Sequence, residues 1–242
     1  MEKERFIVKF AENDNEKQMT YSLRYHHMLK DFRPELQLQS ELDITPADAF
    51  AKHAICIDSQ TGKVVGCYRI ITSDQLPKGE RFVCEDEFDI STLKASGESI
   101  AELSRAVIHK DYRNSIVLML LFKFVLKYLL DKNYRFMIGE ASFFGVDKNV
   151  FASELSYLAH FHSTGEYAIK SLEEKQVSLI PKDQLNQAEI KRNLPPLIRA
   201  YLSFGAKTSS DSFTDYDFGS VDVFILLDSK NLNHAFIDRL LR

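Results

Sequence analysis

Several residue types are scarce in this 242-residue chain, and their scarcity narrows what the protein can be. Tryptophan is absent, and there are three cysteines, nine glycines and six prolines. The cysteines are odd in number and form no Cys-x-x-Cys pair, which argues against a set of disulfides. We therefore interpret Cys56, Cys67 and Cys84 as reduced, small apolar residues of the core in a cytosolic protein.

Positive charge is not in excess either. The 31 lysines and arginines stand against 35 aspartates and glutamates, which gives a formal net charge of −4. This balance argues against nucleic acid as the main partner, although it leaves room for a local basic patch that receives an acidic protein. The composition, 45% hydrophobic and 27% charged, is that of an ordinary globular chain, and the length predicts a single domain over residues 1–242.

A long hydrophobic run is missing as well. The N-terminal MEKERFIVKF lacks the apolar stretch of a signal peptide. The most apolar segment, residues 116–130, contains Lys123 and Lys127. At about 15 residues it falls short of the roughly 20 that a membrane-spanning helix needs. We therefore expect a buried helix and a cytoplasmic protein, with peripheral contact at the inner face of the membrane as the alternative.

The alternation of apolar and polar residues predicts the order of the elements. We expect a strand at residues 5–10, a helix that Asp14 or Asn15 caps and that ends near residue 30, and then a polar loop. The later elements are a hairpin around Gly62, strands at 100–108, 135–141 and 221–227, and helices at 114–131, 150–161, 195–204 and 232–241. This order predicts an α/β sandwich with a mixed, mostly antiparallel sheet flanked by helices.

Residues 102–130 contain an informative junction. They read as a polar strand, the basic turn HKDYRNSI and a long apolar helix. N-acyltransferases that use acetyl-CoA place the cofactor at such a junction, where a glycine-rich turn lets backbone N–H groups approach the pyrophosphate. This turn has no glycine, so we ask what else could carry an acyl group to it.

Several segments in a fixed order resemble a known family. The segments GCYRII and ELSR, with Arg24 on the first helix, resemble those of the acyl-homoserine-lactone synthases and their relatives. The segments EFDIS, ELSRAVIHKDYRN, IGEASFFGVD, ELSYLAHFH, LPPLIRAYLSFGAK and FGSVDVFILL are similar to those of the ornithine N-acyltransferases that begin ornithine-lipid synthesis, also called haemolysin-like acyltransferases. One departure is FAKHAICID, because the family often has an acidic residue and a cysteine just before His53. We place that acidic role on Asp43 or Asp48.

The resemblance implies an N-acetyltransferase-like (acyl-CoA N-acyltransferase) fold and an amide-forming activity. The acyl group, a 3-hydroxy fatty acid in ornithine-lipid synthesis, would come from acyl carrier protein. The acceptor would be the α-amine of an amino acid, with L-ornithine as the first choice, and the product a lyso-lipid. No cofactor would be bound, because the carrier protein delivers its acyl-phosphopantetheine arm from outside. Such a donor brings no adenosine pyrophosphate, which fits the glycine-free turn.

Amide formation from a thioester needs a neutral amine, donors for the developing oxyanion and an apolar slot for the acyl chain. Glu102 is the candidate base, because a strand carboxylate between Ala101 and Leu103 can be partly desolvated and so become more basic. The alternative for Glu102 is a structural pairing with an arginine.

The candidate ligands of the substrate are the three arginines Arg24, Arg69 and Arg105, with Asp43 and Asp48. An arginine can hold a carboxylate through two parallel hydrogen bonds. A buried network between these arginines and Asp43, Asp48 or Glu102 is the alternative. Glu102 and Arg105 are three residues apart, so on a regular strand they face opposite sides unless a bulge realigns them.

The segment after IGEA completes the expected site. Backbone groups near Ser142 could polarise the thioester carbonyl, and Phe143 and Phe144 could line the acyl tunnel, although core packing is the ordinary role of aromatic residues. Basic residues near the turn predict a surface for an acidic carrier protein, with a solvated charged face as the alternative. They are His26, His27, Lys30, Arg33, Lys110 and Arg113.

The sequence argues against a metal site and leaves several other functions open. His160 and His162 point about 200° apart on a helix, so we expect no metal. The chain could be an N-acyl amino acid synthase for glycine or tyrosine, or an acyltransferase of the kind associated with exosortase protein sorting. A lactone synthase is disfavoured, because the segments after residue 194 extend beyond the usual length of such enzymes. A non-catalytic module that binds carrier protein or lipid is the alternative outside the enzymes, and the retained Glu102 and Arg105 argue against it.

Overall fold

The computed structural model of the protein describes residues 5–113 and 115–233. The chain divides into two compact units. Unit 1 comprises Met1–Glu80 and Ala101–Asn133, and unit 2 comprises Arg81–Ile100 and Tyr134–Arg242. The single-domain organisation over residues 1–242 stays a prediction.

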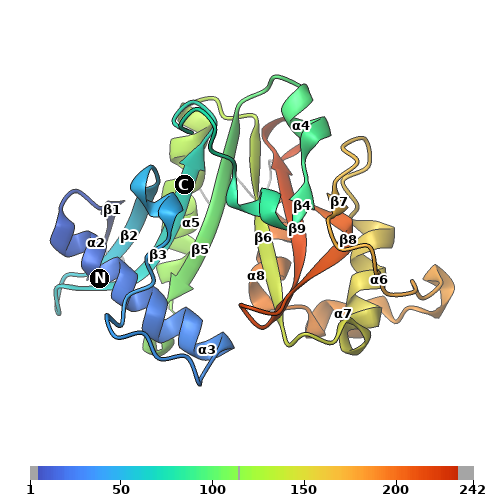
Figure 1. The fold of residues 1–242 in the computed structure, drawn as a ribbon, viewed down its shortest axis with the longest axis horizontal. Coiled ribbons are helices and arrows are strands. Elements are labelled where there is room, and N and C mark those ends of the chain that lie inside the picture. The colour runs from blue at the N-terminus through green and yellow to red at the C-terminus, as the bar shows by residue number, and fades with distance from the viewer. Residues whose placement is uncertain (1–4, 114, 234–242) are drawn as a thin grey trace. The chain divides into compact units, whose positions relative to one another are not determined.

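Unit 1 is an antiparallel sheet with a helix on each face. The strands are β1 (Phe6–Phe10), β2 (Lys52–Asp58), β3 (Lys63–Thr72) and β5 (Ile100–Ile108), and each pairs with the next in that order. Figure 1 shows α2 (Asp14–Arg24) in front of β2 and β3 and α5 (Val117–Asp131) behind the sheet. The predicted hairpin is confirmed, and Gly62 in its turn has a φ of 69°.

The first helix begins one residue earlier than predicted. Asn13, rather than Asp14 or Asn15, is the N-cap, and its side chain accepts a hydrogen bond of 2.9 Å from the Glu16 N–H. The helical run then continues through a π-helical turn, Tyr25–Leu29, into the short α3 (Lys30–Phe32). The long helix begins at Val117, and the predicted start at Asn114 lies outside the described residues.

The packing of α5 on the sheet requires a glycine in β3. A Cβ atom at Gly66 would lie 2.7 Å from Leu121 Cδ1, 2.8 Å from Val117 Cγ1 and 2.9 Å from Ile108 Cδ1. Val117 and Leu121 are fully buried on α5. The missing side chain therefore lets the helix lie close to the strand.

A β-bulge interrupts β5 where the site begins. Cys67 pairs with Val107 and Arg69 pairs with Ser104, so β5 carries one residue more than β3 over this stretch. Arg105 lies within the bulge and has a φ of 52°, in the left-handed region. The strand is therefore not regular between Glu102 and Arg105, and the rule that residues three apart face opposite sides does not apply to this pair.

Unit 2 is built on a second antiparallel arrangement. The strands β6 (Phe136–Phe144) and β8 (Lys207–Asp215) each pair with β9 (Ser220–Asp228). A small two-stranded sheet joins β4 (Phe88–Asp89) to β7 (Lys170–Ser171). The helices are α4 (Ser91–Ala95), α6 (Ala152–Phe161), α7 (Gln187–Asn193) and α8 (Pro196–Ser203).

Short 3-10 turns lie between the helices and strands of both units. They lie at Pro46–Ala49, Val83–Asp86, Lys110–Tyr112, Lys148–Phe151, Lys182–Gln184 and Ser229–Asn231. The 3-10 turn before α6 shortens that helix at its start relative to the predicted 150–161. Most of the helix predicted at 232–241 lies outside the described residues.

The predicted core cysteines are confirmed as buried. Cys56, Cys67 and Cys84 are free thiols with almost no exposure. Burial raises the pKa of both Cys56 and Cys67 to about 12, so these thiols stay protonated. In the part of the chain that the structure describes, no helix is both long and apolar enough to cross a membrane.

Candidate functional site

Arg24 is the centre of a buried polar network in unit 1. Its side chain is fully buried, and its Nε donates a hydrogen bond of 2.6 Å to Asp43 Oδ2. Its Nη1 and Nη2 donate to the two carboxylate oxygens of Asp48, at 2.7 and 3.0 Å. This is the two-pronged geometry expected for an arginine and a carboxylate. Here the carboxylates come from the protein itself, which supports the network alternative for Arg24.

The loop before β2 holds Asp48 in place. Asp48 Oδ2 accepts a hydrogen bond of 2.8 Å from the Thr45 N–H, in a capping box at the start of the 3-10 turn Pro46–Ala49. Burial raises the pKa of Asp48, but the bonds and charge of Arg24 outweigh it and lower that pKa to about 2. Burial likewise lowers the pKa of Arg24, and the two carboxylates more than reverse this effect. Both partners therefore stay ionised in the core.

Arg69 extends the network across the sheet. Its Nε donates to Ser104 Oγ at 2.9 Å, its Nη1 donates to Thr45 Oγ1 at 2.8 Å, and Nη1 lies 3.7 Å from Asp48 Oδ1. Its Nη2 is buried and has no hydrogen-bond partner among the described residues. Burial, reinforced by the nearby charge of Arg105, lowers the pKa of Arg69 to about 10.

Arg105, which lies in the bulge of β5, joins the network of Arg24 and Asp43. Arg105 Nε donates to Asp43 Oδ2 at 3.1 Å, the oxygen that also accepts from Arg24. Glu102 is fully buried, and its charge raises the pKa of Arg69 while the charge of Arg105 lowers it. The structure thus realises the bulged arrangement, in which Glu102 and Arg105 both act on Arg69.

His53 belongs to this network, and the sequence did not single it out as a site residue. It is 3% exposed, lies 3.8 Å from Asp48 Oδ1 and packs edge-on against Tyr21. Burial lowers the pKa of His53 to about 4, so the ring is neutral near pH 7. Its position opposite Arg69 in the β2–β3 pairing was the available signal, because paired residues on antiparallel strands share a face.

The predicted residues of the second segment lie in unit 2, on β6. Ser142 pairs with Asp222 of β9, and its hydroxyl forms a hydrogen bond that acts to lower the pKa of Asp222. Phe143 is 3% exposed and packs on Phe151, with ring centroids 5.0 Å apart, which is the core role. Phe144 is 62% exposed. Their roles at the thioester and along the acyl chain stay predictions.

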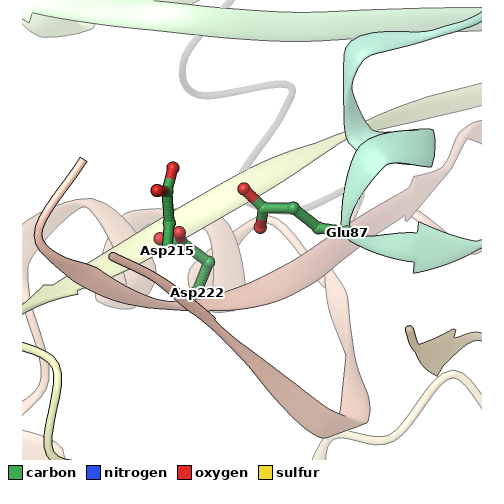
Figure 2. A group of neighbouring side chains, drawn as sticks. All are labelled: Glu87, Asp215 and Asp222. Atoms are coloured by element: carbon green, nitrogen blue, oxygen red, sulfur yellow. The ribbon is translucent and has the colours of Figure 1, made fainter. Parts of the chain in front are cut away.

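Unit 2 also contains an acidic cluster that the sequence analysis missed. Glu87, Asp215 and Asp222 each place one carboxylate oxygen within 4.8 Å of the others, as Figure 2 shows. A metal ion or another cation could bind to such a set of oxygens. The available signal was Asp222 itself, because an acidic residue stands within the otherwise apolar run VDVFILL of a strand that is buried along its length.

The predicted docking residues only partly gather in one place. The rings of His27 and His109 lie 4.0 Å apart, and Arg113 Nη2 donates to the His27 carbonyl at 2.9 Å and also pairs with Asp31. Lys110 follows His109 and is exposed.

The other members of the predicted surface have local partners. His26 lies 3.6 Å from Glu41, and Arg33 donates to Glu35 at 3.2 Å. Lys30 donates to the carbonyls of Pro34 and Leu36. The docking surface predicted from the sequence therefore stays a prediction.

The contacts of His160 and His162, and a groove in unit 1, concern the possible binding of a metal or an apolar ligand. His160 Nε2 contacts the Ile180 carbonyl at 2.9 Å, whereas His162 Nε2 contacts the Tyr157 hydroxyl at 3.0 Å. The two rings thus have separate protein partners. In unit 1, an open apolar groove of about 560 Å³ lies between β1 and α5, lined among others by Phe10 and Phe124.

The network in unit 1 combines a buried carboxylate with charged groups that the protein holds in fixed positions. Glu102 supplies a buried carboxylate, Arg69 has a buried Nη2 amino group without a partner in the described chain, and three nitrogens of Arg24 donate to aspartates. A buried carboxylate can accept a proton from a substrate amine, and a guanidinium can polarise an oxygen. The saturated pairs around Arg24 fix the positions of these groups.

This geometry belongs to a known class of fold. Residues 23–123, which contain the whole network, match the model of the acetyltransferase (GNAT) domain. Solved structures with a similar fold include the CoA-dependent acyl-homoserine lactone synthase MesI, at 13% identity, with 97% of this chain and 95% of that chain covered and a TM-score of 0.53. TofI, solved in a ternary complex with an inhibitor and MTA, is 13% identical, with 97% and 96% of the chains covered and a TM-score of 0.52. The chain therefore has a GNAT-like fold, with a mixed, mostly antiparallel sheet and flanking helices, as predicted.

The particular resemblance is to one group of acyltransferases. The chain is 27% identical to the L-ornithine N(alpha)-acyltransferase of Rhodobacter capsulatus, with 94% of this chain and 92% of the relative covered. It is 27% identical to the protein of the same name in Agrobacterium fabrum, over 95% and 83% of the two chains. The Brucella abortus protein of that name is 26% identical, over 95% and 86%. The resemblance predicted from the motifs is confirmed, and the matched domain and the relatives' names support acyltransferase activity.

Proposed function

We propose that the protein transfers a fatty acyl group, in particular a 3-hydroxyacyl group, from acyl carrier protein to the α-amine of L-ornithine. The observation that carries this proposal is the similarity to curated L-ornithine N(alpha)-acyltransferases over nearly the whole length of both chains. The buried Glu102 beside Arg69 and Arg105 supports the chemistry, since these residues lie within the part that matches the GNAT domain.

The reaction exchanges a thioester for an amide. Glu102 accepts a proton from the ammonium form of the α-amine, directly or through a water, and so frees the nitrogen lone pair. The nitrogen attacks the thioester carbonyl, and the developing oxyanion is stabilised by donors such as Arg69 Nη2, which has no hydrogen-bond partner among residues 5–113 and 115–233. The C–S bond then breaks, and the second proton of the nitrogen passes to the leaving phosphopantetheine thiolate, which gives the neutral amide and the thiol, while Glu102 returns the first proton to the solvent.

The turn before α5 supports carrier protein over coenzyme A as the donor. It contains no glycine, and Arg113 ties it to the π-helical turn through the His27 carbonyl and Asp31. Such a turn offers positive side chains to an acidic protein and little bare backbone to a pyrophosphate. We place the docking surface on His27, Lys110 and Arg113.

A donor and acceptor matrix tests the proposal. Purified protein is offered 3-hydroxyacyl, plain acyl and acetyl groups on carrier protein and on coenzyme A, each with ornithine, glycine, tyrosine or no amine, and the amides are identified by mass spectrometry. We expect N-acylornithine mainly from the 3-hydroxyacyl carrier protein. A preference for glycine or tyrosine would make the protein an N-acyl amino acid synthase of another kind. Product from acetyl-CoA alone would contradict the donor assignment.

A variant pair tests the base. Glu102→Gln removes the proton acceptor and keeps the shape, so we expect the turnover number to fall about 10²- to 10⁴-fold with the folded state retained. Glu98→Gln is the matched control, because Glu98 is 44% exposed and lies shortly before β5. Its turnover should equal that of the unmodified protein. Unchanged turnover in Glu102→Gln would remove Glu102 from the mechanism.

A further inference from the structure

Three carboxylates of unit 2 form a cluster that the reaction above does not use. Glu87 lies just before β4, Asp215 ends β8 and Asp222 lies within β9. One carboxylate oxygen of each lies within 4.8 Å of the other two, and Figure 2 shows the three side chains turned toward a common point. Three like charges this close together repel one another, so the arrangement requires either protons or a cation.

Two members of the cluster are buried and have an oxygen that the chain leaves unsatisfied. Glu87 is 9% exposed and Asp222 is 3% exposed. Glu87 Oε2 and Asp222 Oδ1 have no hydrogen-bond partner within residues 5–113 and 115–233. Because buried polar atoms are nearly always paired, two such acceptors in one cluster indicate a ligand that comes from outside the chain.

The two aspartates are oriented by local donors. Asp222 Oδ2 accepts a hydrogen bond of 2.8 Å from Ser220 Oγ, and the hydroxyl of Ser142 also bonds to Asp222. Asp215 Oδ1 accepts a bond of 2.7 Å from the Phe218 N–H, in the turn between β8 and β9. Donors of this kind fix the direction in which a carboxylate presents an oxygen to a bound ion.

The surroundings of the cluster are acidic. The charges that act most strongly on Glu87 are those of Glu140 and Asp222. Burial, followed by this repulsion, raises the pKa of Glu87 well above its usual range. Basic side chains of unit 2 are engaged with other carboxylates, in the pairs Arg81–Asp86, Lys94–Glu85, Arg135–Asp228 and Lys148–Glu173. A positive charge from outside the chain would therefore offset the repulsion.

We propose that Glu87, Asp215 and Asp222 bind one divalent cation of the kind that prefers oxygen ligands, namely Ca²⁺, Mg²⁺ or Mn²⁺. The inference is independent of the acyltransfer reaction, because the three carboxylates all belong to unit 2 and no step of that reaction uses them. A cation here departs from the metal-free protein that His160 and His162 led us to expect.

A divalent cation accounts for the cluster better than a proton or a zinc ion. A proton shared between carboxyl groups joins two oxygens, whereas three lie together here. Zinc sites usually include cysteine or histidine, and this set contains carboxylates alone. Carboxylate oxygens suit Ca²⁺, Mg²⁺ and Mn²⁺ instead.

The spacing of the oxygens fits the coordination sphere of such an ion. Oxygens bind Ca²⁺ at about 2.3–2.6 Å, so two ligands of one ion lie at most about 5 Å apart. For Mg²⁺, with ligands at about 2.1 Å, the limit is about 4.2 Å. The oxygens of the cluster, within 4.8 Å of one another, therefore fit Ca²⁺ directly and Mg²⁺ after at most a small approach. The half-buried Asp215 leaves room for the waters that complete about six ligands.

Such an ion would join two segments of unit 2 that are far apart in the sequence. Glu87 belongs to the segment Arg81–Ile100, whereas Asp215 and Asp222 belong to the hairpin of β8 and β9. A ligand that binds the folded state alone stabilises that state as its concentration rises. We therefore expect the ion to raise the thermal stability of the protein.

Calorimetric titration and thermal unfolding of the full chain, first treated with a chelator and dialysed, test the proposal. CaCl₂, MgCl₂ and MnCl₂ are added separately, with NaCl of matched ionic strength as the blank. We expect one ion to bind per chain. At a concentration about 100-fold above the dissociation constant, the ion should raise the melting temperature by about 5–10 °C. The cation that binds most tightly is the one that the site selects.

Two variants test the assignment of the ligands. Glu87→Gln and Asp215→Asn each remove one negative charge and keep the shape of the side chain. We expect the ion to bind at least about 100-fold more weakly to either variant, since even the loss of an outer partner in a metal site commonly costs 10- to 100-fold. After chelator treatment, both variants should be at least as stable as the unmodified protein, because each substitution removes part of the repulsion. A carboxylate that only accepted hydrogen bonds from the chain would lose stability on substitution instead.

A matched control separates the cluster from the general acidity around it. Asp86→Asn also removes one negative charge next to Glu87 in the sequence, but the Asp86 side chain is 60% exposed and pairs with Arg81. This variant should bind the ion as the unmodified protein does. A loss of affinity as large as that of Glu87→Gln would show that the general acidity, rather than the cluster, attracts the ion.

Three outcomes would overturn the proposal. If none of the three cations gives heat of binding or changes the melting temperature, a shared proton rather than a metal ion explains the cluster. If NaCl of matched ionic strength stabilises the protein equally, the effect is general screening of charge. If Glu87→Gln and Asp215→Asn both bind the ion as tightly as the unmodified protein does, the ion binds elsewhere.

Discussion

Arg24 lies at the centre of the buried network of unit 1. It is fully buried, and its three nitrogens donate to Asp43 and Asp48. Removal of one partner from a buried ion pair leaves an uncompensated charge, which costs far more than the net contribution of the intact pair. We therefore expect substitutions of Arg24 to lower the stability of the fold, and any loss of activity to follow from that.

We expect Arg24→Ala to lower the free energy of unfolding by about 3–5 kcal/mol, because it leaves two buried aspartates without their counter-charge. Urea unfolding followed by circular dichroism measures the change. Arg33→Ala is the control, since Arg33 is 36% exposed and pairs with the exposed Glu35, and it should cost at most about 1 kcal/mol. A cost for Arg24→Ala no larger than that of the control would show that the network does not stabilise the fold.

At the scale of elements, the contact between α5 and β3 depends on the bare backbone at Gly66. The nearest atoms to a new Cβ belong to Leu121, Val117 and Ile108, and all three are closer than 3.0 Å. A methyl group there requires α5 or its side chains to move.

We predict that Gly66→Ala lowers the free energy of unfolding by about 1–3 kcal/mol, as overpacking of a core usually does. Leu121→Ala alone should cost about 2–5 kcal/mol through the cavity it leaves. In the double variant the added methyl group enters that cavity, so the combined loss should be smaller than the sum of the two single losses. A strictly additive result in the thermodynamic cycle would contradict the packing explanation.

The elements themselves were largely predictable from the sequence, and the deviations have local causes. The alternating strands and the long apolar helix were confirmed, because hydrophobic periodicity marks them directly. The strand β8 was missed, since its sequence KTSSDSFTD is polar and contains a register shift. The bulge in β5 could be named only as a possibility, because the hydrophobic pattern of a strand does not show where an extra residue is inserted.

At the scale of the whole molecule, the residues of the buried network were named from the sequence, and their pairing with one another was named only as the alternative to substrate contact. Arg24, Asp43 and Asp48 were all named, yet their mutual hydrogen bonds depend on a loop whose path no local pattern fixes. The cluster of Glu87 and Asp222 joins segments far apart in the chain. Such contacts arise from the fold as a unit, and for this reason sequence periodicity does not reveal them.

A carrier protein that binds as proposed would make the reaction depend on salt concentration. If an acidic carrier protein docks on the turn before α5, its KM should rise as ionic strength increases, because screening weakens the attraction between exposed charges. Lys110→Glu should raise the KM for the carrier protein by about threefold or more at low salt and flatten its salt dependence. Lys132→Glu, an exposed lysine just after the other end of α5, should behave as the unmodified protein. Equal salt dependence for acyl carrier protein and a neutral thioester would contradict this docking mode.

The left-handed backbone at Arg105 changes how substitutions at this position must be compared. An L-residue in this conformation stores roughly 1–2 kcal/mol of strain, from which glycine is exempt. Alanine at position 105 would keep the strain and lose the bond to Asp43, whereas glycine would lose the same bond and release the strain. The difference in stability between the two truncations is therefore the backbone strain at position 105 reduced by the extra conformational entropy, about 0.5–1 kcal/mol, that a glycine loses on folding.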